Sequence, residues 1–133
     1  MGEKVVCTGR RWWWVLFLVT TGFERLQRSK VAALGIATLF EAIQVDALDD
    51  PSQRPGKKQL FQRIMAAHDF ASSEVAVIGD SLHEIRAGNQ LGLTTIQVLR
   101  DGVREEAEAQ HHVATFAALP RLLRNLDESR YTP

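Results

Sequence analysis

A short apolar run that ends in two polar residues and is followed by a second acid constrains this chain most. Residues 75–79 are Val-Ala-Val-Ile-Gly, and Asp80 and Ser81 come next, with Glu84 about one helical turn later. A continuous apolar run of this length is typical of a strand buried on both faces of a parallel sheet. Ligands bind at the carboxyl ends of such strands. The pattern therefore predicts an α/β sheet with Asp80 and Glu84 at its ligand-binding edge.

Composition and charge exclude several classes of protein. The 133 residues carry 16 basic and 16 acidic side chains. A nucleic-acid binder would show a basic excess, so we expect no nucleic-acid partner. Cys7 is the only cysteine, which excludes an intrachain disulfide and suits a reducing, cytoplasmic location. The apolar run after Arg10 and Arg11 is too short to cross a bilayer, and no small-residue cleavage site follows it, so we expect neither a membrane span nor export.

Apolar periodicity and turn residues predict alternating strands and helices over most of the chain. Strands are predicted at residues 13–20, 40–45, 74–79, 94–98 and 112–114, and helices at 23–34, 58–68, 82–90, 103–110 and 116–126. A polar loop is expected at 46–56. This alternation predicts right-handed crossovers and a parallel sheet covered by helices on both faces, a three-layer Rossmann-like fold.

Two details of these helices follow from residue types. The side chains expected to face the sheet from helix 23–34 are Phe23, Leu26, Ala33 and Leu34, and those from helix 58–68 are Leu60, Phe61, Ile64 and Ala67. The last helix is expected to begin near Leu119, because Pro120 is not tolerated in the interior of a helix.

Three polar motifs occur in a fixed order along this predicted sheet. The first strand ends in Thr20-Thr21-Gly22, Lys57 opens a helix, and Gly79-Asp80-Ser81 leads into an Ala-Gly…Leu-Gly-x-x-Thr-Ile pattern over residues 87–96. In this order the motifs resemble the C-terminal part of the core domain of the haloacid dehalogenase (HAD) superfamily. The resemblance implies Mg²⁺-dependent hydrolysis of a phosphate ester, in which an aspartate nucleophile attacks the phosphoryl group.

The resemblance implies roles for the residues at the first strand end and at the helix start. Thr20 matches the hydroxyl that binds a phosphoryl oxygen, and Thr21 and Gly22 lie beside it in the substrate-binding turn. Lys57 matches the lysine that offsets the charge of the nucleophile and of the phosphoryl oxygens, which phosphoryl transfer requires. An alternative for the threonines is that they merely end a strand.

The resemblance likewise implies that Asp80 and Glu84 hold Mg²⁺, which proteins usually bind through one or two carboxylates, waters and substrate phosphate. Lys58 and Arg54 are weaker candidates for the role of Lys57, and lysines at a helix start also suit a solvated surface. Asp80 has the alternative role of capping the helix that follows it. Glu84 has that of a first-turn acid favoured by the helix dipole.

One motif of the family is missing. An apolar strand followed by Asp-x-Asp-x-Thr supplies the nucleophile, the general acid and a Mg²⁺ ligand, but the 133 residues contain no Asp-x-Asp, and the cap of many relatives is also missing. Residues 4–7 read as a short strand, yet the connection to residue 13 is too short for a parallel crossover. We therefore expect a truncated domain whose first strand is missing or replaced. Residues 1–12 would be an unrelated segment, 13–126 a partial HAD-like core and 127–133 a frayed tail.

These observations predict a HAD-like hydrolase of small phosphorylated substrates that is inactive alone because the nucleophile is absent. The alternative is a non-catalytic phosphate- or metal-binding domain, or a self-assembling interaction module. Loss of the central strand would expose sheet edges, so we expect a homo-oligomer, formed through the edge at residues 13–20 or with the N-terminal segment filling the gap. A receiver-like signalling domain also places Asp, Thr and Lys at strand ends, but its paired N-terminal acids are not found.

Overall fold

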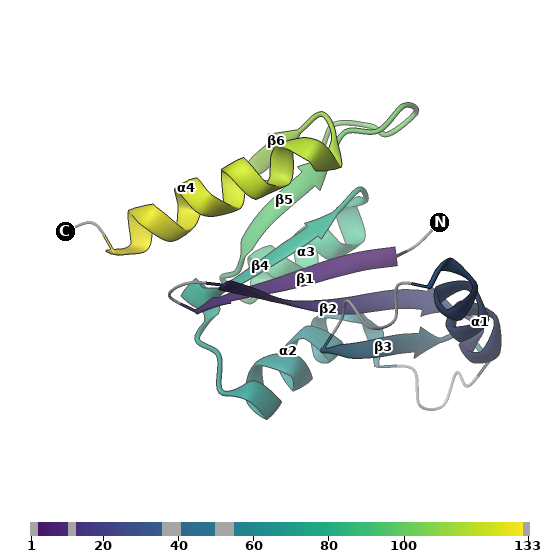
Figure 1. The fold of residues 1–133 in the computed structure, drawn as a ribbon. Helices are drawn as coiled ribbons and strands as arrows, with labels where there is room; N and C mark the ends of the chain where they lie inside the picture. Colours follow the sequence, from purple (N-terminus) through teal and green to yellow (C-terminus); the bar gives the residue numbers. More distant parts are fainter. Residues whose placement is uncertain (1–2, 11–12, 36–40, 50–54, 132–133) are drawn as a thin grey trace.

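The computed structural model describes residues 3–10, 13–35, 41–49 and 55–131, and within them one six-stranded sheet forms the centre of the molecule (Figure 1). The strands are β1 (Glu3–Arg10), β2 (Trp13–Gly22), β3 (Ala42–Ala47), β4 (Val75–Gly79), β5 (Thr94–Val98) and β6 (His111–Val113). The helices are α1 (Glu24–Leu34), α2 (Gly56–His68), α3 (Leu82–Gln90) and α4 (Leu119–Tyr131), with short 3-10 turns η2 (Ser72–Glu74) and η3 (Phe116–Ala118).

The sheet has the strand order β3-β2-β1-β4-β5-β6, and β1 runs against both of its neighbours. β2 is parallel to β3, and β4, β5 and β6 are parallel to one another. β1 lies antiparallel to β2, with Glu3 opposite Thr20, and antiparallel to β4, with Val5 opposite Ile78. The predicted Rossmann-like fold with a replaced first strand is confirmed, and the replacement is a central strand of reversed direction.

Reversal of β1 explains how so short a connection can join two strands of this sheet. An antiparallel pair can be joined by a hairpin, whereas a parallel pair needs a crossover of a dozen or more residues. β1 includes residues 4–7, which read as a strand, and fills the central gap within a single chain. β2 is therefore paired on both sides, so the edge at residues 13–20 is not open for another chain. Homo-oligomer formation stays a prediction.

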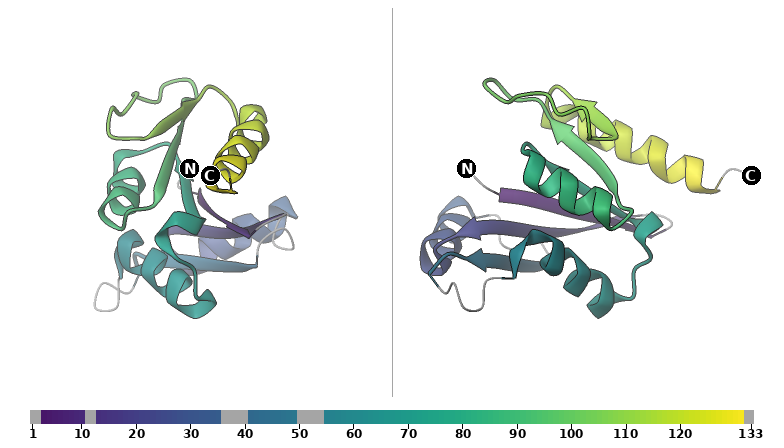
Figure 2. Two further views of the ribbon diagram at one scale, coloured as in Figure 1. Left: turned by 90° about the vertical axis from the view of Figure 1, so that its left-hand side faces the viewer. Right: turned by 180° about the vertical axis from the view of Figure 1, so that it is seen from behind.

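Helices cover both faces of the sheet, which gives the predicted three layers (Figure 2). On one face, α2 packs Leu60 and Phe61 against Phe17 of β2, in a core that β4 and α3 also share. On the other face, α4 packs Leu119 and Leu123 against β4 and β5. The site described below lies at the carboxyl ends of β2, β3 and β4, where α2 and α3 begin.

Helix α1 turns a different face to the sheet from the predicted one. The residues expected to face inward are exposed: Phe23, Leu26, Ala33 and Leu34. The buried residues are Gln27 and Val31 instead. Gln27 reaches the end of β2, where its Nε2 donates to the Thr21 carbonyl oxygen at 3.4 Å. This polar attachment sets the rotation of α1 about its axis against the apolar pattern.

Several element boundaries also differ from the predicted ones. β3 continues to Ala47 and α2 begins at Gly56, so the predicted loop 46–56 is shorter, while Phe40 and Arg54 lie outside the described residues. α2 buries three of its predicted inward residues, but Ala67 is exposed. The loop is shorter than predicted because the Asp46 carboxylate accepts a hydrogen bond from the Gly56 N–H and so joins the end of β3 to the start of α2.

The C-terminal region differs in one helix. Residues 103–110 form turns instead of the predicted helix, because the buried side chain of Gln97 bonds the Arg104 carbonyl oxygen and the Glu106 N–H and so replaces helical bonds. α4 begins at Leu119, as Pro120 predicts, and runs to Tyr131, past the predicted end at 126. None of the helices in the described part of the chain is long and apolar enough to cross a membrane.

Candidate functional site

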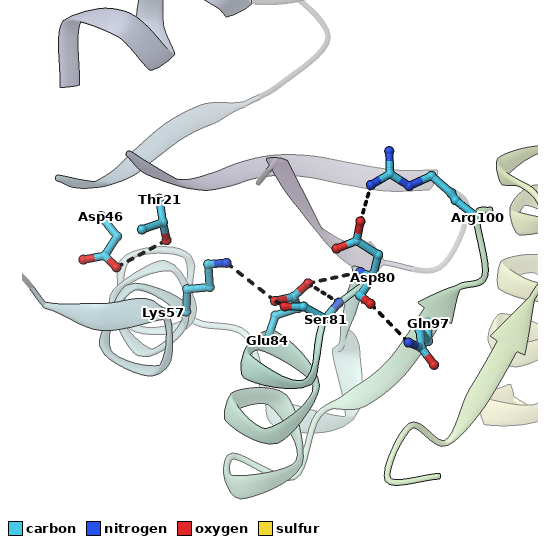
Figure 3. Close-up of polar contacts among 8 residues, drawn as sticks. All are labelled: Thr21, Asp46, Lys57, Asp80, Ser81, Glu84, Gln97 and Arg100. Atoms are coloured by element: carbon cyan, nitrogen blue, oxygen red, sulfur yellow. Dashed lines mark hydrogen bonds and ion pairs between the residues drawn. The ribbon is translucent and has the colours of Figure 1, made fainter. Parts of the chain in front are cut away.

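The carboxyl ends of β2, β3 and β4 meet the first turns of α2 and α3 at one edge of the sheet (Figure 3). We call this place the strand-end site, and its residues are Thr21, Asp46, Lys57, Asp80, Ser81 and Glu84. Three neighbouring polar pairs make it up: Thr21 with Asp46, Lys57 with Glu84, and Asp80 with an arginine from beyond β5. The structure thus brings together four of the predicted site residues, Thr21, Lys57, Asp80 and Glu84.

Glu84 is the most tightly held member of the site. Its side chain is 0% exposed, and Oε1 accepts hydrogen bonds from the Asp80 N–H at 3.1 Å and the Ser81 N–H at 2.9 Å. Oε2 accepts the Ser81 hydroxyl at 2.5 Å and lies 3.5 Å from Lys57 Nζ. Buried carboxylates are stable only when they are paired and hydrogen-bonded in this way. Glu84 therefore completes the capping box of α3, whose N-cap residue is Ser81, and its predicted role as a metal ligand stays a prediction.

Lys57 lies in the first turn of α2 and points across the site toward α3 (Figure 3). Its side chain is 13% exposed, so its charge is well shielded from water. Part of this charge is offset by the buried Glu84 carboxylate, which lies 3.5 Å from Nζ. Lys58, the weaker candidate, is exposed. The structure thus places Lys57, rather than Lys58, at the strand-end site.

Asp46 links β3 to the end of β2 and to the start of α2. Its side chain is 2% exposed, Oδ2 accepts the Thr21 hydroxyl at 3.3 Å, and Oδ1 accepts the Gly56 N–H at 3.2 Å. These bonds fix the start of α2 next to the end of β2. By holding Gly56, Asp46 also helps to position Lys57, which follows Gly56 in the chain.

Thr20 and Gly22 lie away from the strand-end site, on the α1 side of β2. Thr20 is 0% exposed and its hydroxyl donates to Gln27 Oε1 at 3.3 Å. Gly22 is buried against the same glutamine, whose side chain occupies the space that a Cβ would need. Their predicted substrate-binding roles stay predictions. In this structure Thr21, and not Thr20, presents its hydroxyl to the site.

Asp80 points away from Glu84 and pairs with Arg100 (Figure 3). Its side chain is 18% exposed, against 0% for Glu84. The peptide carbonyl of Asp80 accepts a hydrogen bond from Gln97 Nε2 at 3.1 Å, which fastens the turn after β4 to β5. Of the two predicted metal-binding acids, Asp80 is thus the more accessible.

A cavity of about 580 Å³ opens from the site between α2 and α3. It is lined by four residues of the site, Thr21, Asp46, Lys57 and Ser81, and by residues of α2 and α3 that include Lys58 and Arg86. Glu108 raises the pKa of the Arg86 guanidinium through a hydrogen bond and its negative charge. Small-molecule sites fall in this size range, so the cavity has room for more than a phosphate group.

The donor set decides how a magnesium ion would fit this site. Mg²⁺ takes six oxygen ligands and often keeps several waters, with one or two carboxylates and substrate phosphate completing the set. Asp80 is the accessible carboxylate, whereas the oxygens of Glu84 already accept hydrogen bonds. Within the described ranges no three His, Cys, Asp or Glu side chains gather into a metal site. The residues fit an ion held by Asp80, waters and phosphate oxygens, with Glu84 behind it.

Asp46, Ser81 and Arg100 were not predicted as site residues. Asp46 ends an apolar strand and Arg100 follows one closely, so the strand-end argument used for Asp80 also applies to them. Ser81 stands three positions before Glu84, the spacing of a capping box. Those signals were present in the sequence, although the Asp80–Arg100 contact requires the fold.

Comparisons with known proteins show similarity in sequence and in fold. A model of the HAD-hydrolase-like family matches residues 55–126, which is more than half of the chain. The enolase-phosphatase E1 of Sorangium cellulosum (strain So ce56) is 34% identical over 76 residues, which cover 57% of this chain and 31% of that protein.

Solved structures with this fold include the HAD-hydrolase YfnB from Bacillus subtilis bound to magnesium. It has a TM-score of 0.68 and 23% identity, over 80% of this chain and 48% of that one. A haloacid dehalogenase-like family hydrolase from Xanthomonas campestris has a TM-score of 0.67 and 22% identity, over 85% of this chain and 48% of that one. The chain spans less than half the length of each of these three relatives.

Proposed function

Because the chain belongs to the HAD-hydrolase-like family, we propose that its strand-end site binds the phosphoryl group of a small phosphate ester together with Mg²⁺. The observation that carries this proposal is the position of Lys57, shielded from water at the head of a cavity that Thr21 and Ser81 also line. These three side chains offer an ammonium and two hydroxyls to phosphoryl oxygens. Asp80, next to the cavity-lining Ser81, would hold the ion.

Each of these residues has a separate task in binding. Lys57 would offset the charge of the phosphoryl oxygens, and the hydroxyls of Thr21 and Ser81 would turn from Asp46 and Glu84 to donate to them when phosphate binds. When bound, Mg²⁺ would neutralise further negative charge on the same oxygens. Asp46 and Glu84 contribute by fixing Thr21, Lys57 and the turn at Ser81 in place.

We also propose that these 133 residues do not hydrolyse the ester at an appreciable rate. The sequence has no Asp-x-Asp motif, and the central strand β1 enters the site edge instead of leaving it. A phosphoryl group bound by Lys57 would therefore lack the aspartate that the family uses as nucleophile. The chain would then bind the phosphate ester without hydrolysing it.

Phosphate binding and turnover test the two parts of this proposal separately. Titration of inorganic phosphate with Mg²⁺, followed calorimetrically, should show binding that Lys57→Met weakens about tenfold or more, because a charged hydrogen bond is lost. Lys58→Met should weaken it less, because Lys58 also lines the cavity but is exposed to solvent. Equal loss in both variants would contradict the proposed phosphate site.

For turnover, wild type and Asp80→Asn are compared on an aryl phosphate with and without Mg²⁺. We expect no Mg²⁺-dependent rate above that of the variant. Turnover that Asp80→Asn abolishes would show that another group replaces the missing nucleophile, and the inactivity proposal would be wrong.

A second candidate function is that of a self-associating module. Exposed apolar side chains in α1 and just before it, such as Leu26 and Phe23, favour it, because exposed apolar patches mark interaction sites. Light scattering at micromolar concentration gives the mass directly. A dimer mass that Leu26→Ser returns to that of a monomer would support this function, and a monomer mass for the wild type would exclude it.

A further inference from the structure

Arg100 stands where a divalent ion would approach Asp80. We propose that its guanidinium occupies the cation position beside this carboxylate, so that an ion must displace Arg100 before it can bind. The inference rests on the proposed function, since it concerns the same site, but it adds a residue that sets the affinity for the ion.

The contact itself is direct. Arg100 Nη2 donates to Asp80 Oδ2, and the two side chains are 48% and 18% exposed. The guanidinium therefore approaches the carboxylate from the solvent side, while the buried Glu84 lies on the protein side of the turn (Figure 3). An ion coming from solvent meets the same oxygen that the arginine holds.

The fold holds Arg100 at this place. Arg100 follows β5 closely, and its carbonyl oxygen accepts the Val103 N–H at 3.0 Å, which closes a tight turn. Gln97, fully buried in β5, bonds the Asp80 carbonyl oxygen at 3.1 Å and the Arg104 carbonyl oxygen at 2.8 Å. One side chain thus connects the turn of the acid to the turn of the arginine, so the pair is positioned by the backbone on both sides.

Electrostatics explains why the two cations exclude each other. Asp80 carries one negative charge, and both Arg100 and Mg²⁺ are positive, so their simultaneous approach to one carboxylate is repulsive. A guanidinium is a good stand-in because it is always charged and donates several N–H bonds. Once displaced, Arg100 remains tethered at the rim, where it can bind a phosphoryl oxygen of the ligand. Ion and arginine therefore exchange places on Asp80.

The two cations must affect each other reciprocally. If Arg100 weakens binding of the ion, then binding of the ion must weaken the Asp80–Arg100 pair by the same factor. Because ion pairs of this exposure contribute modestly, removal of the arginine should tighten ion binding by roughly two- to fivefold.

The experiment measures the affinity of the full chain for Mn²⁺, which is followed by the electron paramagnetic resonance of the free ion, with Mg²⁺ as competitor. Arg100→Gln should bind Mn²⁺ more tightly than wild type by that factor. Arg104→Gln is the matched control, because Arg104 is an exposed arginine of the same loop. Gln97 bonds the backbone carbonyl of Arg104, so a change of the Arg104 side chain leaves that bond in place. Arg100→Lys should restore affinity to near the wild-type value.

Each outcome is decisive. Equal affinities for Arg100→Gln and Arg104→Gln would mean that only the general charge of the loop matters, and the proposal would be wrong. The same holds if neither wild type nor Arg100→Gln binds Mn²⁺. Undiminished binding in Asp80→Asn would instead overturn the proposed function, because the ion would then be held elsewhere.

Discussion

The junction of β4 with α3 and the junction of β2 with α1 share one plan but differ in charge. In each, a strand ends in a buried glycine, and a polar side chain near the start of the next helix packs against that glycine: Glu84 against Gly79, and Gln27 against Gly22. Glu84 accepts three hydrogen bonds and faces Lys57, whereas Gln27 makes two longer bonds of 3.3 and 3.4 Å.

The difference shows what a buried charge demands of its surroundings. An amide is neutral and tolerates a loose pair of bonds, but a carboxylate must be matched by donors and a cation. The β4–α3 junction therefore collects Ser81 and Lys57 around Glu84, and the cavity opens beside them. The β2–α1 junction, with its neutral Gln27, is held only by the two longer bonds to the Thr20 hydroxyl and the Thr21 carbonyl oxygen.

The largest effect should come from Glu84→Ala. It leaves Lys57 without this carboxylate and strands the N–H groups of Asp80 and Ser81, so we expect the free energy of unfolding to fall by about 3–5 kcal/mol. Urea denaturation followed by tryptophan fluorescence measures it. Glu84→Gln, which keeps the shape and one acceptor, should cost less. A loss below about 1 kcal/mol for the alanine variant would contradict the claim that Glu84 and its partners are held together by strong charged interactions.

The next largest effects should come from replacing the two glycines by alanine, and the loss of stability should differ between the two junctions. Gly79→Ala places a Cβ against the firmly held Glu84 carboxylate, and we expect a loss of about 1–3 kcal/mol from overpacking. Gly22→Ala meets Gln27, which has fewer bonds to give up and can turn aside, so it should cost less. Thermal unfolding of both variants gives the order, and the reverse order would undermine the comparison.

A smaller effect is expected for Gln27→Leu. Its removal leaves the Thr20 hydroxyl and the Thr21 carbonyl without this partner, which should cost about 1 kcal/mol in urea denaturation. If the loss equals that of Glu84→Ala, neutral and charged junctions would be equally demanding, and the contrast drawn here would fail.

The smallest effect should be that of Leu26→Ser. Because Leu26 is 51% exposed, the free energy of unfolding should change by no more than about 0.5 kcal/mol. Val31→Ala, at a buried position of the same helix, is the control and should cost clearly more. A large loss at Leu26 would mean that α1 faces the sheet as its apolar pattern predicts.

The sequence was most informative in the β4–α3–β5 region. There, continuous apolar runs, a glycine and a capping pattern all indicate the same elements, and the site residues Asp80 and Glu84 follow directly from the strand end. Where one polar side chain outweighs an apolar pattern, prediction fails. Gln27 rotates α1, and Gln97 holds residues 103–110 in turns.

Other features depend on contacts between distant segments. The direction of β1 is set by pairing with β2 and β4, which the pattern of a single strand does not encode. The Asp80–Arg100 pair likewise joins turns that follow different strands. The individual roles predicted for Thr20, Gly22 and Lys57 stay predictions, although the structure places only Lys57 of these three at the strand-end site.

The reversed direction of β1 has a practical consequence for attaching anything to this protein. Glu3 stands opposite Thr20, so the chain enters the sheet at the edge where the parallel strands end. α4 carries the other terminus to the opposite end of the molecule (Figure 1). A fluorophore, affinity handle or surface linker joined ahead of Glu3 would therefore crowd the mouth of the site. The same group joined beyond Tyr131 would leave that mouth clear for ligand measurements.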